Sequence, residues 1–121
     1  MNQNFLDLGL EDALVQAVDH LGFEKPSPVQ EKCIPIVLNE DTDLVALAQT
    51  GTGKTAAFGL PLIQKVDNTN RDTQALVLAP TRELCIQIAS DLNNYARFKK
   101  TNVVAVYGGE SIMDQARSLK R

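Results

Sequence analysis

The sequence has few of the residues from which a disulfide framework or a metal site is built. Its 121 residues include two cysteines and one histidine. Cys33 and Cys85 each lie inside an apolar pattern of helical period and form no CxxC pair, so we expect reduced core thiols, as in a cytosolic protein. His20 falls off the apolar stripe of its helix, which predicts a surface residue and not a ligand.

The sequence also lacks the segments that direct a chain to or across a membrane. Its N-terminus has no basic region followed by an apolar stretch, and no apolar run approaches the length needed to cross a bilayer. It contains no internal repeat and no low-complexity tract. We therefore expect a cytoplasmic protein with one small core and no membrane partner.

The charge gives little support for non-specific binding to nucleic acid. The formal net charge is −3, whereas bulk electrostatic binders are basic. The charge is uneven, since residues 1–50 carry nine acids and two bases and residues 97–121 carry six bases and two acids. The basic end is either an ordinary solvated face or one edge of a polyanion site.

The apolar pattern predicts an α/β fold. Apolar residues recur with helical period over 10–21, 28–38, 55–66, 84–95 and from 110 to 121. Unbroken apolar runs at 43–48, 75–80 and 102–109 predict strands buried on both faces of a parallel sheet. These runs are spaced by about thirty residues, the size of a βαβ unit.

The stretch GFEKPSPVQ, residues 22–30, predicts the start of the second helix. Ser27 is suited to be the N-cap and Pro28 the first helical residue. Gln30 lies three residues after the cap, so S-x-x-Q forms a capping box.

The stretch AQTGTGKT, residues 48–55, lies between the first predicted strand and its helix. It matches the phosphate-binding pattern G-x-x-x-x-G-K-[ST] except at its first position, which is alanine. Small residues let backbone N–H groups curl around phosphate oxygens at a helix N-terminus. The catalytic Lys54 should reach the β and γ phosphates, and the Thr55 hydroxyl should ligate Mg²⁺. The predicted loop residues are Ala48, Gln49, Thr50, Gly51, Thr52, Gly53, Lys54 and Thr55.

Four elements together resemble the DEAD-box ATP-dependent RNA helicases. AQTGTGKT, with alanine first, is similar to motif I of that family, and GFEKPSPVQ is similar to its Q motif. Phe5 lies upstream of the Q motif, where the family places an aromatic residue. PTRELCIQ, residues 80–87, resembles motif Ia, and Gly108–Gly109 resembles the GG element. These elements extend over nearly the whole chain.

The resemblance implies a role for each of these elements. ATP and Mg²⁺ would be the cofactors. Gln30 would recognise adenine through its amide, which has one acceptor and one donor face, and Phe5 would stack on the base. The residues implied to hold the backbone of RNA, without reading its bases, are Pro80, Thr81, Arg82, Gly108 and Gly109. Taken alone, the same segments are ordinary helix caps and turns.

Parts of a complete helicase are not in the sequence. None of the three apolar runs ends in the acids that hold Mg²⁺ and position water for hydrolysis. By the resemblance, the DEAD tetrapeptide, the SAT motif and the second core domain are missing. We therefore expect a fragment that ends within a helix. Residues 1–40 would form a helical Q-motif region, and residues 41–121 a truncated RecA-like sheet flanked by helices. It should bind nucleotide without RNA-stimulated hydrolysis, and its open strand edges should promote self-association.

Two other functions remain open at this point. The chain could be another P-loop enzyme such as a small-molecule kinase, or a stand-alone nucleotide-binding module. A preference for ATP over GTP that depends on Gln30 would favour a helicase over the first alternative. A DEAD tetrapeptide after a further apolar strand would exclude the second.

Overall fold

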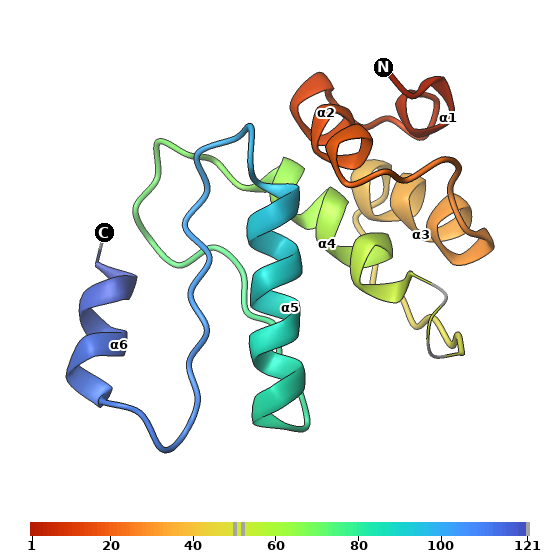
Figure 1. The fold of residues 1–121 in the computed structure, drawn as a ribbon. Coiled ribbons are helices and arrows are strands. Elements are labelled where there is room, and N and C mark those ends of the chain that lie inside the picture. Colours follow the sequence, from red (N-terminus) through yellow and green to blue (C-terminus); the bar gives the residue numbers. More distant parts are fainter. Residues whose placement is uncertain (50, 52, 121) are drawn as a thin grey trace.

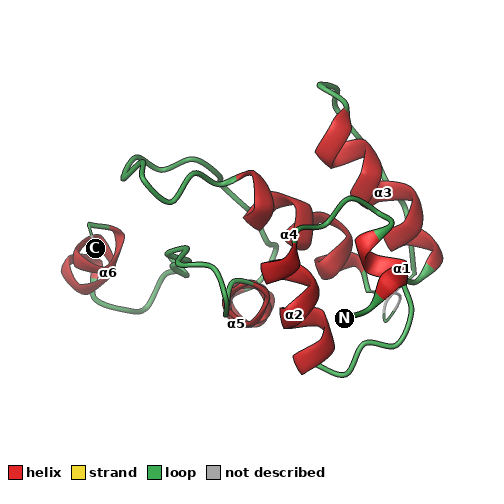
Figure 2. Ribbon diagram, turned by 90° about the horizontal axis from the view of Figure 1, so that it is seen from above, coloured by secondary structure: helices red, strands yellow, loops and turns green. Residues whose placement is uncertain are grey.

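The computed structural model describes residues 1–49, 51 and 53–120, and within them the secondary structure is helical. The described helices are α1 (Gln3–Leu6), α2 (Asp12–His20), α3 (Pro28–Asn39), α4 (Lys54–Lys65), α5 (Arg82–Tyr95) and α6 (Ile112–Leu119). Helix α4 packs between α3 and α5, while α2 contacts both α1 and α5. Helix α6 stands apart from the others in both ribbon views (Figures 1 and 2).

Side-chain caps begin most of these helices. The predicted capping box of α3 is confirmed, because the Ser27 hydroxyl accepts from the Gln30 backbone N–H and the Gln30 side-chain oxygen accepts from the Ser27 N–H. Helix α3 continues through Pro35 to Asn39. The predicted helices at 10–21, 28–38, 55–66 and 84–95 all form, with small differences at their ends. Helix α1, a single turn capped by the Asn2 side chain, was not predicted.

One apolar core unites the helices from α1 to α5. The Phe5, Leu14, Ile34 and Leu60 side chains are fully buried in it. Its members are Phe5, Leu10, Leu14, Val15, Val18, Ile34, Ala56, Leu60, Ile63, Leu92, Tyr95 and Ala96. This core fixes α4, and with it the loop before α4, relative to the helix that carries Gln30.

The predicted parallel sheet is not formed by the described residues. Segments 43–48, 75–80 and 102–109 are irregular there, and no backbone hydrogen bond joins any two of them in that part of the chain. An apolar run shows that a segment is suited to burial, but a ladder also needs a second strand alongside it. Several apolar side chains of these segments therefore stay in solvent, among them Val45, which is 87% exposed, and Leu47, which is 95% exposed, whereas Val77 and Val103 pack against the core.

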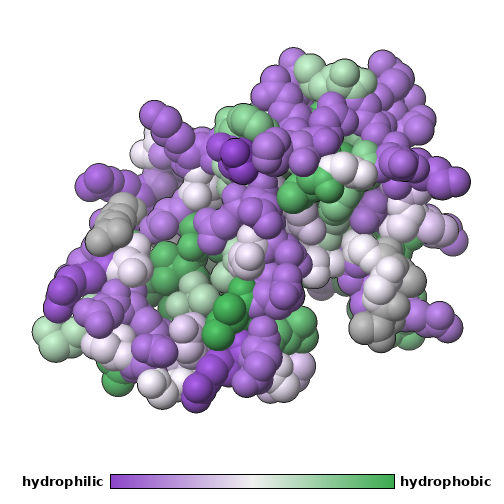
Figure 3. All heavy atoms as spheres, viewed as in Figure 1, coloured by the Kyte–Doolittle hydropathy of each residue, from purple (hydrophilic) through white to green (hydrophobic). Residues whose placement is uncertain are grey.

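Apolar surface also gathers around the later segments. Leu76 and Leu78 are strongly exposed and Val106 is more than half exposed. Figure 3 shows apolar side chains reaching the surface between α5 and α6. No helix in the described part of the chain is both long and apolar enough to span a bilayer.

Three smaller predictions can be compared directly with the structure. Both cysteines are free thiols, and Cys33 is buried as expected, but Cys85 is only half-buried and is therefore not a full core residue. His20 is exposed, as predicted. Helix α6 ends at Leu119, short of the predicted Arg121, which lies outside the described residues.

Candidate functional site

The loop before α4 has the backbone of an anion site. Gly53 is the N-cap of α4, with φ 80° and ψ 32°, which is the left-handed region that favours glycine. Glycine has no side chain to cap the first amide groups of the helix, so these groups are left for water or an anion. Lys54 begins the helix and is exposed, and Thr55 follows it, half-buried.

Gln30 connects the start of α3 to this loop. Its side-chain nitrogen donates to the Gly53 carbonyl oxygen at 3.2 Å, while its side-chain oxygen accepts from the Ser27 N–H at 3.0 Å. A Cβ atom built on Gly53 would collide with the Gln30 amide nitrogen. Gln30 is only 5% exposed, yet its amide keeps one further N–H and one further lone pair. The sequence predicted the cap but not this contact, which joins residues far apart in the chain.

The other residues predicted to bind the nucleotide differ in their exposure. Gly51 is exposed with φ 80°, and Ala48 is half-buried beside it in the loop. Phe5 is fully buried and packs against Phe23, with ring centroids 6.3 Å apart, so it offers no face to a ligand in this structure. Gln49 is exposed at the end of the preceding segment. The predicted Thr50 and Thr52 lie outside the described residues.

A second cluster forms where α5 begins. Thr81 is the N-cap of α5, and its hydroxyl accepts from the Leu84 N–H at 3.1 Å. The exposed Arg82 side chain reaches the turn at Gly109, where a Cβ atom would lie 2.6 Å from the guanidinium nitrogen Nη2. Motif Ia and the GG element, which are separate in sequence, are thus brought together. Pro80 and Gly108 flank the cluster and are exposed.

Helices α4, α5 and α6 all run upward in the view of Figure 1. The first residues of α5 and α6 lie at the bottom of that view, while α4 begins higher and to the right. This is the arrangement expected for parallel α/β units, in which ligands bind at the carboxyl ends of the strand positions. The direction of the chain is therefore that of the predicted fold, although the ladder itself is absent from the described residues.

The basic stretch RFKK, residues 97–100, lies near the end of α4 and away from its start. Lys99 is mostly buried, and its ammonium group donates to the carbonyl oxygens of Ile63 and Gln64 at 2.9 and 2.8 Å and pairs with Glu11 at 3.5 Å. These carbonyl groups belong to the last turn of α4, while Lys54 lies at the start of that helix. A twelve-residue helix is about 18 Å long, so Lys99 stabilises the fold far from the candidate phosphate site.

Two residues of the second cluster carried no signal in the sequence. The Arg82 guanidinium carbon lies over the Tyr107 ring, 5.8 Å from its centroid. The Gln115 side chain of α6 binds both the N–H and the carbonyl of Tyr107. A tyrosine before a glycine pair and a helical glutamine are ordinary residues, and only their placement makes them part of the cluster.

The chain is similar to helicases in both sequence and structure. The family model described as DEAD/DEAH box helicase matches residues 27–121. ATP-dependent RNA helicase CshA from Listeria monocytogenes is 51% identical over 117 residues, which cover 97% of this chain and 22% of that protein. The chain thus spans about a fifth of the length of the curated relatives it matches.

Solved structures show the same likeness. A DEAD box protein from the hyperthermophile Methanococcus jannaschii superposes with a TM-score of 0.89 at 43% identity, covering 97% of this chain and 32% of that one. Dbp5 from S. cerevisiae bound to RNA and ADP BeF3 superposes with a TM-score of 0.81 at 29% identity, covering 98% and 35%. The arrangement of the described helices is therefore shared with chains about three times as long.

Proposed function

This chain belongs to the DEAD/DEAH box helicase family, and we propose that it supplies the ATP-binding surface and part of the RNA-binding surface of an ATP-dependent RNA helicase. At its natural length the protein would couple ATP hydrolysis to RNA binding and local separation of strands. The observation that carries the proposal is the start of α4, where left-handed Gly53, held by Gln30, precedes Lys54 and Thr55.

The start of α4 is suited to the phosphates of ATP with Mg²⁺. A glycine N-cap presents backbone N–H groups and the positive end of the helix dipole to an anion. Lys54 is exposed at this position and would hold the β and γ phosphates as a point charge. The Thr55 hydroxyl would supply one oxygen ligand to Mg²⁺, which itself neutralises charge on the phosphates.

Gln30 would read the adenine base while it keeps its contact with the loop. Its remaining N–H and its remaining lone pair match the N7 acceptor and the N6–H donor of adenine. The same side chain would then join base recognition to the loop that holds the phosphates, through the Gly53 carbonyl. For Phe5 we propose stacking on the base only together with a shift of α1, because its ring is fully buried here.

The second cluster would hold RNA by its backbone. Arg82 and the exposed amides around Gly108 and Gly109 present N–H donors but no group arranged to read base edges. The likeness to Dbp5 bound to RNA and ADP BeF3 supports this role. Binding should therefore be insensitive to base sequence and sensitive to salt.

We propose that these 121 residues by themselves do not hydrolyse ATP in response to RNA. Hydrolysis requires an acid that holds Mg²⁺ and a group that orients water, and none of the apolar runs ends in Asp or Glu. Exposed Leu47, Leu76 and Leu78 should also make the isolated chain associate. Light scattering over a concentration series, run beside a phosphate-release assay with RNA, tests both statements.

Nucleotide titration of a Lys54→Ala variant tests the proposed function. A hydrogen bond to a charged group contributes about 1.5–3 kcal/mol, so the affinity for ADP should fall about tenfold to hundredfold. Lys100→Ala, at an exposed position near the opposite end of α4, should bind like the parent. Equal ADP affinity in Lys54→Ala and the parent would refute the phosphate site.

The base specificity distinguishes a helicase from another nucleotide enzyme. A preference for ATP over GTP should disappear in Gln30→Ala, since the amide is the group proposed to contact adenine. A small-molecule kinase would keep its preference in that variant. Membership of the helicase family already disfavours this alternative.

A further inference from the structure

The Arg82 guanidinium is held between two groups of the segment before α6. The Tyr107 ring lies beneath it, with 5.8 Å from the guanidinium carbon to the ring centroid. Gly109 adjoins it with φ 90°, and any Cβ at Gly109 would lie 2.6 Å from Nη2. An exposed arginine ordinarily samples many rotamers, but here its charged group lies over an aromatic ring at a cation–π distance, in a space that only glycine leaves open.

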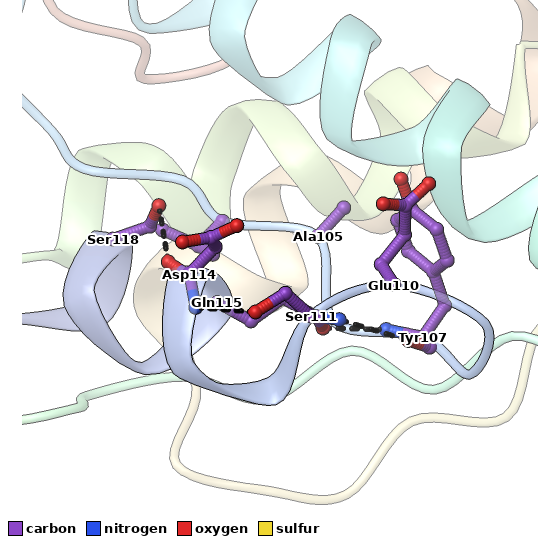
Figure 4. A pocket seen from close by; sticks show the side chains of 8 residues that line it. Ala105, Tyr107, Glu110, Ser111, Asp114, Gln115 and Ser118 are labelled. Atoms are coloured by element: carbon purple, nitrogen blue, oxygen red, sulfur yellow. Dashed lines mark hydrogen bonds between the residues drawn. The ribbon is translucent and has the colours of Figure 1, made fainter.

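The backbone of Tyr107 is itself fixed by α6. The Gln115 side-chain oxygen accepts from the Tyr107 N–H at 2.9 Å, and its side-chain nitrogen donates to the Tyr107 carbonyl at 3.0 Å (Figure 4). This pair of bonds is what a neighbouring strand would make to one residue of a ladder. The amide of Gln115 thus takes the place of a strand partner at the residue that carries the ring.

The opposite side of the segment is tied to α5. The Cys85 thiol donates to the Val106 carbonyl oxygen at 3.7 Å, and Cys85 lies three residues after Arg82, one turn along the same helix face. Segment 106–109 is therefore joined to α6 through Gln115 and to α5 through both Cys85 and Arg82. The three contacts place the ring under the guanidinium.

We propose that Gln115 and Tyr107 are positioning residues that orient Arg82 for a phosphate of bound RNA. Gln115 fixes the Tyr107 backbone, and the Tyr107 ring attracts the guanidinium through a cation–π contact. A cation–π contact uses none of the guanidinium N–H donors, so these stay available for paired bonds to phosphate oxygens. The conformational freedom that Arg82 loses on binding is then smaller, because its side chain is oriented before RNA arrives. The inference rests on the proposed RNA contact of Arg82.

Anisotropy titration of a labelled oligouridylate into the protein at its natural length, with a non-hydrolysable ATP analogue, tests the inference. Tyr107→Leu, which removes the ring, and Gln115→Met, which removes both bonds, should each weaken RNA binding roughly threefold to tenfold. Tyr107→Phe keeps the ring and should change it less than about twofold. Gln16→Met, at an exposed position of α2, is the matched control, and ATP affinity should be unchanged in all four.

The Arg82→Ala background shows whether Tyr107 acts through Arg82. If it does, Tyr107→Leu adds no further loss there, whereas an equal loss in both backgrounds overturns the inference. Wild-type RNA affinity in both Tyr107→Leu and Gln115→Met, with Arg82→Ala impaired, overturns the positioning role alone. Unimpaired binding by Arg82→Ala removes the proposed RNA contact itself, and the inference with it. If Tyr107→Leu unfolds below the assay temperature, Gln115→Met and Tyr107→Phe still test the positioning role.

Discussion

Replacing Gly53 by alanine should lower the free energy of unfolding by about 2–4 kcal/mol. Gly53 has φ 80° and ψ 32°, and a residue with a Cβ in this left-handed region costs about 1–2 kcal/mol. The new Cβ would also collide with the Gln30 amide nitrogen, so the bond from that nitrogen to the Gly53 carbonyl must break. Losing a bond that satisfies a buried donor costs about 1–2 kcal/mol more.

Gly22→Ala is the matched control for this substitution. Gly22 has φ 82°, and a Cβ built there meets no atom within 4 Å. It therefore carries the backbone cost of about 1–2 kcal/mol without a collision. Urea denaturation of the chain at low concentration gives both values, and their difference measures the obstruction by Gln30.

Gly53→Ala in a Gln30→Ala background tests whether Gln30 is the side chain that collides with the new Cβ. When Gln30 is already alanine, Gly53→Ala should cost no more than Gly22→Ala, because the colliding group is gone. If Gly53→Ala and Gly22→Ala cost the same in the parent chain, the contact between Gln30 and Gly53 does not exist in solution. The proposed link between the adenine site and the phosphate loop would then be lost as well.

Three further predictions concern the core and its edges. Lys99→Met should lower the free energy of unfolding by about 2–3 kcal/mol, because the Lys99 ammonium group binds two α4 carbonyl oxygens. The control Lys100→Met, at an exposed position, should change it by less than about 0.5 kcal/mol. Equal effects of the two substitutions in urea denaturation would contradict the packing of Lys99. Phe5→Leu should destabilise the chain by about 1–2 kcal/mol, and if its ring also stacks on adenine, titration should show ATP affinity falling more than the affinity for inorganic triphosphate. Burial, aided by Asp91, raises the pKa of Tyr95 from 10.0 to about 12, so the unfolded chain releases this proton at lower pH and the melting temperature should fall as pH rises from 10 to 12. Tyr95→Phe should lose less stability than the parent over that range, and an identical fall in both would show that Tyr95 is not responsible.

The helices show which parts of this structure the local sequence determines. Ser27 and Gln30 form the predicted capping box because its partners are three residues apart and need nothing from the rest of the fold. The apolar stripes likewise predicted where α2, α3, α4 and α5 lie, since a helix satisfies its own backbone hydrogen bonds. The motif around Lys54 identified the candidate phosphate site for the same reason, because a strand position, a glycine-rich turn and a helix start are adjacent in the chain.

Strands differ from helices in this respect. The runs at 43–48, 75–80 and 102–109 have the composition of buried strands, but their hydrogen-bond partners must come from elsewhere in the chain. The described residues provide no such partner, and segment 102–109 takes a side chain, the amide of Gln115, in its place. Composition therefore predicted the suitability of these segments for a sheet and not the pairing.

The site itself depended on contacts between residues distant in sequence. The sequence assigned Gln30 to a cap and to adenine, but packing of α3 against α4 brought its amide to Gly53. Arg82 and Gly109 were assigned to RNA separately, while the approach of segment 106–109 to α5 set the guanidinium on Tyr107. Phe5 and Lys99 show the opposite case. The Phe5 ring is buried in the core and the Lys99 ammonium group is bonded to α4, so neither side chain is available to a ligand. Residue type and local spacing determined which chemistry the chain carries, and long-range packing decided which of those side chains remain available for it.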